Sequence, residues 1–196
     1  MQKPKGYDEA SAGFEVTPIK PGAHYGKILQ VSEKTVSNGK NQVVVLFDFS
    51  DQDEQKGLFN TQFKNDSRTP KKWPFLGTKY IWVNDYNDPN KTSSQFKRFC
   101  SCVEHSNGYK IQWGGDDWGQ QFKNKKIGIV FGEVENEYEG RIYKRVEPRW
   151  FCSIDSVPNT NIPSPKLLPV VQRPVPKTDA NGFMELPNTG DDMIPF

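Results

Sequence analysis

The segment from Gln42 to Ser50, with the sequence QVVVLFDFS, constrains the fold of this chain more than any other. β-Branched and aromatic residues at this density favour a strand, and the alternation of side chains along a strand gives it one apolar face. The Asn38-Gly39 pair before it is typical of a tight hairpin turn, with the alternating segment His24–Thr35 as the opposite strand. The four side chains that we expect to share a buried face are Val43, Val45, Phe47 and Phe49.

Further elements follow from local patterns. Apolar residues spaced i, i+3, i+4 and i+7 predict one helix over Thr92–His105. Polar turns and the breakers Glu139-Gly140 and Pro148 separate the remaining apolar segments, which we predict to be strands. These segments are Gly57–Phe63 as the third strand, Thr78–Val83, Lys125–Glu135, Arg141–Val146 and Trp150–Ser156.

Three strands, an insertion with one helix and two or three further strands predict an all-β domain with one helix. An OB-fold has this layout, and we expect a five-stranded OB-like barrel with an insertion, spanning residues 14–156. A small β-sandwich is the alternative architecture. Residues 1–13 are polar, contain Gly and Pro, and are predicted to form a flexible N-terminal arm.

The composition changes at Val157. Eight of the 15 prolines lie from Pro158 onward, and the hydrophobic content of the whole chain is only 34%. Such a segment buries too little apolar surface to offset the entropy of the chain. We therefore predict a disordered Pro-rich linker over 157–190, followed by an acidic tip over 191–196.

The tip reads Asp191-Asp192-Met193-Ile194-Pro195-Phe196. It resembles the C-terminal tip of bacterial single-stranded DNA-binding proteins, in which acidic residues precede Ile-Pro-Phe behind an OB domain and a Pro-rich linker. The body of the chain more loosely resembles the single-stranded DNA-binding proteins of bacteriophages. The sequence departs from the bacterial pattern at Met193, where another Asp is usual.

The resemblance implies that the domain binds single-stranded DNA and that the tip docks replication, recombination or repair proteins. In such a tip, Phe196 fills an apolar pocket and its carboxylate meets a basic side chain. Ile194 and Pro195 add apolar contact, while Asp191 and Asp192 steer the encounter.

Binding a strand without reading its sequence requires cations along a groove and aromatic faces for the bases. Period-2 alternation places Arg141, Tyr143 and Arg145 on one face, opposite Ile142 and Val146. This face is a candidate stacking platform, and a solvated outer face with a chance Tyr is the alternative. The net charge of +2 means that any DNA-binding charge must be local.

A basic, Pro-containing loop and the following strand supply the other candidates. Trp73 follows the loop, and we expect its ring to be exposed for ligand contact. Tyr80 and Trp82 share a face of the strand, although Trp82 also fits a place in the core. The cations of the loop that we expect to contact DNA are Lys64, Arg68, Lys71 and Lys72.

The sequence contains no motif that indicates an enzyme, a cofactor site or a metal site. Cys100 and Cys102 point about 200° apart on a helix, so Cys100, Cys102, His105 and Cys152 are expected not to share a zinc ion. An odd number of cysteines and the lack of a signal peptide or apolar span favour a cytoplasmic protein, in a host cell if the chain is viral. The sequence does not decide the oligomeric state, and a homo-oligomer stays open.

Three other functions stay open. The first is an RNA-binding OB module, the second is a protein-interaction adaptor without nucleic-acid binding, and the third is a metal-dependent nuclease. The nuclease interpretation depends on Asp116-Asp117, which are more simply explained as part of a solvated Gly-rich loop.

Overall fold

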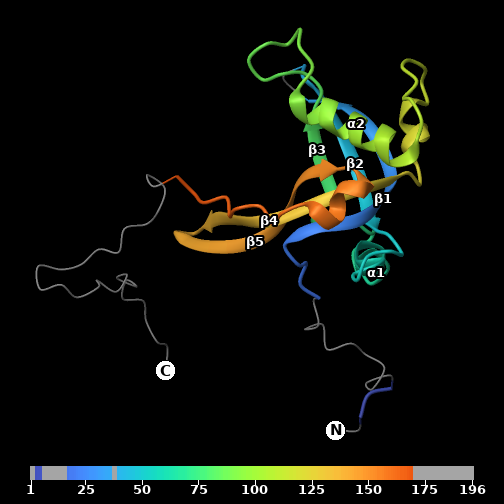
Figure 1. The fold of residues 1–196 in the computed structure, drawn as a ribbon. Helices are drawn as coiled ribbons and strands as arrows, with labels where there is room; N and C mark the ends of the chain where they lie inside the picture. The colour runs from blue at the N-terminus through green and yellow to red at the C-terminus, as the bar shows by residue number, and fades with distance from the viewer. Residues whose placement is uncertain (1–2, 6–16, 37–38, 170–196) are drawn as a thin grey trace, which may run out of the picture.

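The computed structural model describes residues 3–5, 17–36 and 39–169 (Figure 1). Its five strands form one antiparallel sheet in the order β3-β2-β1-β4-β5. The strands are β1 (Gly22–Thr35), β2 (Asn41–Phe49), β3 (Thr78–Trp82), β4 (Lys126–Tyr138) and β5 (Arg141–Cys152). The helices are α1 (Leu58–Lys64) and α2 (Ser94–Asn107), with short 3-10 helices η1 (Phe75–Gly77), η2 (Trp118–Phe122) and η3 (Ile154–Asn159).

The sheet curls around its central strand, β1. The first half of β1 pairs with β4 and the second half pairs with β2, and a bulge between Ile28 and Gln30 lets the strand bend. The edge strands approach each other where Lys79 Nζ donates to the carbonyl of Pro148 at 2.8 Å, but no ladder of backbone hydrogen bonds joins β3 to β5. This is the partly open five-stranded barrel of an OB-fold, as predicted.

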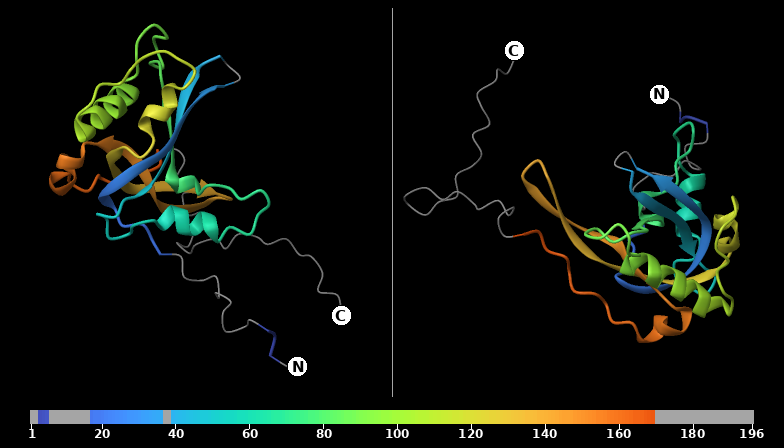
Figure 2. Two further views of the ribbon diagram at one scale, coloured as in Figure 1. Left: turned by 90° about the vertical axis from the view of Figure 1, so that its right-hand side faces the viewer. Right: turned by 90° about the horizontal axis from the view of Figure 1, so that it is seen from above.

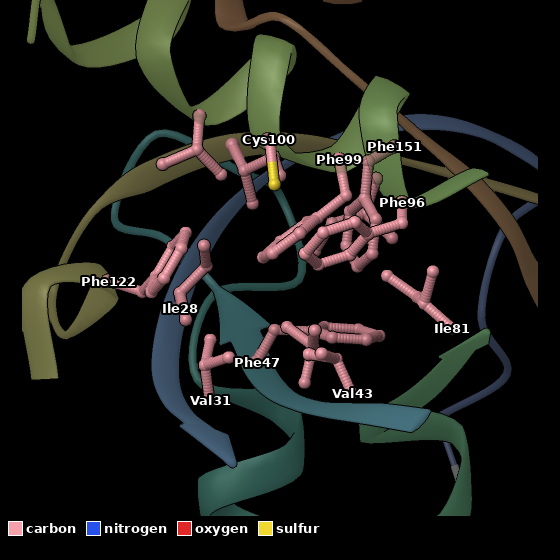
Figure 3. Close-up of a cluster of buried hydrophobic side chains, with 14 of the residues drawn as sticks. Ile28, Val31, Val43, Phe47, Ile81, Phe96, Phe99, Cys100, Phe122 and Phe151 are labelled. Carbon is pink, nitrogen blue, oxygen red and sulfur yellow. The ribbon is translucent and has the colours of Figure 1, made fainter. Parts of the chain in front are cut away.

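The core fills the barrel and continues under α2 (Figure 3). All four side chains expected on the buried face of β2 are buried. The ring of Phe47 packs edge-to-face against Phe59, Phe131 and Phe151, with centroid separations of 5.8, 6.3 and 5.9 Å. The side chains that α2 contributes are the predicted set Phe96, Phe99, Cys100 and Val103.

The segment Gly57–Phe63, predicted to be the third strand, is instead the start and body of α1. Gly57 has a left-handed backbone with φ of 67°, which turns the chain into the helix. The buried carboxylate of Asp48 then accepts the N–H groups of Phe59 and Asn60, each at 3.0 Å. Because a side chain on β2 caps the helix and Phe59 is buried against the sheet, the helical arrangement is the stable one.

The segments Arg141–Val146 and Trp150–Ser156, predicted to be separate, belong largely to one strand. β5 runs through Pro148, and the register shifts opposite it, between Val130 and Phe131 of β4. A bulge tolerates a residue that has no N–H to donate, so Pro148 does not end the strand.

The ordered chain continues past residue 156, where we expected the linker to begin. Val157 is buried within η3, and an extended segment follows it to residue 169. Lys166 exchanges backbone hydrogen bonds with Glu133 and Glu135 of β4, both at 2.9 Å. The remainder of the predicted linker and the tip, residues 170–196, lie outside the described residues, as do 1–2 and 6–16 of the N-terminal region.

His24 and Asp53 form a buried ion pair at the start of β1. Nδ1 of His24 lies 3.1 Å from Oδ2 of Asp53, and Nε2 lies 2.8 Å from the carbonyl oxygen of Lys20. Both partners are hydrogen-bond acceptors, so the doubly protonated ring satisfies both of them and the charged form is favoured. Burial disfavours the charged ring, but the bonds to Asp53 and Lys20 outweigh burial and hold the pKa of His24 above its ordinary value.

We expect the free energy of unfolding to fall as the pH rises from 6 to 8. Because the pKa of His24 is higher in the folded than in the unfolded chain, protonation of the ring stabilises the fold. This contribution is complete at pH values below the unfolded pKa of about 6.5, and it is lost as the pH rises through the folded-state pKa. Urea unfolding at a series of pH values measures the change. His24→Gln should flatten the pH profile, because it removes the titrating ring from the pair. Equal profiles for wild type and His24→Gln would contradict the charged pair.

Candidate nucleic-acid interface

The outer face of β3 carries two aromatic side chains. Tyr80 is 45% exposed and Trp82 is 40% exposed, whereas Ile81 between them points inward and is 2% exposed. The register of β3 against β2 places Tyr80 beside Val44 and Trp82 beside Gln42. Trp82 is therefore not a core residue, and the two rings form a surface that two neighbouring bases can stack on.

Two further exposed aromatic rings, each with a cation over it, stand before and after β3 in the chain. Phe75, just before β3, is 59% exposed, and the guanidinium carbon of Arg145 lies 5.4 Å from its ring centroid. Tyr86, just after β3, is 81% exposed, and Nζ of Lys40 lies 4.3 Å from its ring centroid. We call this set the aromatic row, and its members are Phe75, Tyr80, Trp82 and Tyr86.

Phe75 and Tyr86 were not predicted from the sequence. Each is a single aromatic residue in a loop without periodicity, so no local pattern shows its exposure. The nearest sequence signal is position alone: one residue precedes the short strand Thr78–Val83 and the other follows it.

The far parts of β4 and β5 form a two-stranded arm, which we define as residues 132–147, beyond the last pairing of β4 with β1 (Figure 1). As predicted, one face of the arm carries Arg141, Tyr143 and Arg145 of β5. Their register partners on β4 are Tyr138, Asn136 and Val134.

The other face of the arm is not the buried face that we expected. Ile142 is 39% exposed because the arm extends beyond the barrel, and only Val146, nearer the base, packs against the core. Both faces of the arm are therefore exposed near its turn, but its aromatic side chains, Tyr138 and Tyr143, lie only on the face of Arg141. Two views of the ribbon from other directions also show the arm extending away from the barrel (Figure 2).

Arg145 links the arm to the aromatic row. Its Nε and Nη2 donate to Oε1 of Glu147 at 2.8 and 2.6 Å, which holds the guanidinium beside Phe75. The carboxylate offsets part of its charge. Arg145 is therefore suited to stacking and orientation, whereas Arg141, exposed near the turn of the arm, carries the more accessible charge.

Asp66 organises the basic loop between α1 and η1. Arg68 Nε donates to Oδ1 of Asp66 at 2.8 Å, and the backbone N–H of Lys72 donates to Oδ2 at 2.8 Å. The Arg68 guanidinium holds the pKa of Asp66 well below its usual range, so this carboxylate stays charged. Arg68 is thus paired within the loop, and the exposed ammonium groups there belong to Lys64, Lys71 and Lys72.

Trp73, which was expected to be exposed for ligand contact, is instead partly buried against the core. Its ring packs against Phe63 with centroids 5.6 Å apart, and its indole N–H donates to the carbonyl of Gly77 at 2.9 Å. The indole fills the space beside Gly77 that a side chain at that position would occupy, since an added Cβ would lie 2.6 Å from Nε1. Trp73 therefore supports the loop, and Phe75 is the exposed ring.

A second cationic region lies at the seam between β3 and β5. A cleft of about 450 Å³ lies there, and the cations that line it are Lys79, Arg98, Arg149 and Lys166. One carboxylate, that of Glu147, also lines it. Burial, together with the charges of Arg149 and Lys166, lowers the pKa of Lys79, although Glu147 opposes the shift. This cleft adds positive potential beside the arm.

The cysteines are packed thiols. Burial raises the pKa of Cys100 to about 12 and that of Cys102 to about 11, so neither is a ready metal ligand or nucleophile. Within the described residues, no group of three His, Cys, Asp or Glu side chains is placed to hold a metal ion. None of the helices in the part of the chain that the structure describes is long and apolar enough to cross a bilayer.

No protein-family model matches the chain, and a search of curated proteins finds no match.

Proposed function

We propose that this protein binds single-stranded DNA with little sequence preference. The observation that carries the proposal is the aromatic row, held on the open outer face of an OB barrel with Arg145 at one end and Lys40 at the other. OB-folds bind oligonucleotides on this face. Stacking on aromatic rings contributes about 1–3 kcal/mol per base and tolerates any sequence because every base has a π-face.

Local positive charge supplies the contacts to phosphate. The basic loop comes shortly before Phe75 in the chain, and the Arg145–Phe75 contact brings the arm to the same end of the aromatic row. A strand that stacks on the row would pass between them. The side chains proposed to neutralise phosphates there are Lys64, Lys71, Lys72 and Arg141.

The test of this arrangement is the salt dependence of binding. For single strands, the logarithm of the binding constant falls with the logarithm of salt concentration by about 0.7 per phosphate neutralised. We expect the triple variant Lys71→Ala/Lys72→Ala/Arg141→Ala to flatten this slope by about 2, measured by fluorescence titration with oligo-dT.

The matched control is Lys56→Ala/Lys97→Ala, which removes exposed cations outside the proposed interface. It should leave the slope near that of wild type. A steep slope that the triple variant does not change would show that phosphates are bound elsewhere, and a wild-type slope near zero would remove the basis of the proposal.

The tip, 191–196, is proposed to dock partner proteins of DNA replication, recombination or repair, on the strength of its sequence. A strand coated by many copies would present many tips and so raise the local concentration of partners. The site on the barrel and the tip would act independently, so Phe196→Ala should leave the affinity for oligo-dT unchanged. A cytoplasmic location, that of the host for a viral chain, belongs to this proposal.

A further inference from the structure

A pocket of about 350 Å³ lies at one end of the barrel, which we call the mouth pocket. The β1–β2 hairpin, the residue after β3, the start of α2 and the loop before η2 enclose it. Barrel mouths are common places for ligands because several elements converge there. The lining residues that matter below are Glu33, Asn41, Gln42, Val83, Trp113 and Trp118.

Trp113 forms an exposed, well-supported edge of the mouth pocket. Its side chain is 66% exposed, yet its ring stacks on Trp118 with centroids 5.9 Å apart and an angle of 24° between the planes. Trp118 is itself buried, at 7% exposure, and packs against Phe96 and Phe122. An exposed indole held by a buried one presents a flat face with little freedom left to lose on binding.

Trp118 also leaves a hydrogen bond unmade. Its Nε1 is buried and has no hydrogen-bond partner within the described residues. A buried donor without an acceptor is costly. Because this donor is fully buried, the surface that the mouth pocket offers a ligand is the aromatic face of Trp113.

The mouth pocket adjoins the aromatic row. Asn41 lines both this pocket and a smaller one of about 80 Å³ that Trp82 and Tyr86 also line. The backbone of Asn41 accepts a hydrogen bond from the N–H of Val83, the residue after Trp82, at 3.1 Å. A DNA strand that passes the ring of Trp82 therefore reaches the mouth pocket at Val83, the next residue of the protein chain.

We propose that the mouth pocket takes one unstacked base of the bound strand, which stacks on Trp113 after its neighbour has stacked on Trp82. This inference rests on the proposed function and extends its site. A nucleobase suits the pocket because it offers a flat π-face to the indole and polar edges to the rim. The rim side chains that can meet those edges are Glu33, Asn41 and Gln42.

The test is Trp113→Ala, measured by anisotropy of a labelled oligo-dT of about 12 nucleotides. Loss of one stacked base should weaken binding about 5- to 100-fold and leave the salt slope unchanged, because no phosphate contact is removed. Trp113 is exposed, so the variant should keep the wild-type unfolding midpoint. Ile162→Ala, which removes another side chain of 66% exposure away from the pocket, is the matched control.

Photo-cross-linking of wild type to an oligonucleotide carrying 5-iodouracil locates the contact. We expect cross-links in tryptic peptide 80–91, which holds Tyr80 and Trp82, and in peptide 111–123, which holds Trp113. Binding by Trp113→Ala within about twofold of wild type would overturn the inference, as would cross-links in 80–91 without any in 111–123. Neither result touches the proposed function, which is tested separately by whether wild type binds the strand and how steeply that binding depends on salt.

Discussion

Replacing both Tyr80 and Trp82 by alanine is expected to weaken the binding of single-stranded DNA by about 2–6 kcal/mol, or roughly 30- to 20,000-fold. Each ring stands on the outer face of β3 and offers one stacking surface. The loss should appear as a weaker dissociation constant in an anisotropy titration with oligo-dT. The salt slope should change little, because both side chains are uncharged.

The double variant should fold normally, since both side chains are 40% exposed or more. Its matched control is Tyr80→Phe/Trp82→Phe, which keeps two aromatic faces and should keep most of the affinity. Ile162→Ala/Leu167→Ala, at exposed apolar positions outside the aromatic row, should bind as wild type does. A double alanine variant with native circular dichroism and native affinity would show that the strand does not lie on β3.

Replacing Asp48 by alanine is expected to lower the free energy of unfolding by about 3 kcal/mol or more. Its carboxylate accepts the N–H groups of Phe49, Phe59 and Asn60 at 2.8–3.0 Å and is only 4% exposed. Alanine would leave buried donors of α1 without acceptors. Burial raises the pKa of Asp48, against the pull of these hydrogen bonds, so the charge carries a cost of its own and the net loss stays below the sum of three bonds.

Urea unfolding of the wild type, Asp48→Ala and Asp48→Asn measures this contribution. The asparagine keeps one oxygen acceptor and should lose about half as much stability as alanine. Asp51→Ala, at an exposed position in the next turn, should change stability by less than about 0.5 kcal/mol. If Asp48→Ala also lowered the free energy of unfolding by less than about 0.5 kcal/mol, α1 would be held by the burial of Phe59 alone.

The strands that sequence alone predicts well are those whose alternation decides their burial. β1, β2 and β4 lie within a few residues of their predicted bounds, because a half-buried strand shows its period directly. α1 was missed because its cap comes from Asp48, ten residues upstream, through a contact that exists only once β2 has formed. Local pattern favours a strand at Gly57–Phe63, and tertiary structure overrides it.

The candidate site was predictable to a similar degree. Tyr80 and Trp82 share a face because side chains alternate along a strand. Their exposure, with Ile81 buried between them, shows that this face is the outer face of the barrel. Trp73 was misplaced because a basic neighbourhood does not reveal that an indole packs on Phe63. Trp113 gave no signal, since its support by Trp118 depends on how a Gly-rich loop returns to the barrel.

The most direct measurement of the central claim is an anisotropy titration of labelled oligo-dT with the full-length wild-type protein, followed by competition with unlabelled duplex DNA. Stacked, paired bases cannot reach the aromatic row, so we predict saturable, salt-sensitive binding that unlabelled single strand displaces and that duplex of the same length displaces far less. Absence of binding, or displacement by duplex at the same concentration as single strand, would contradict the account.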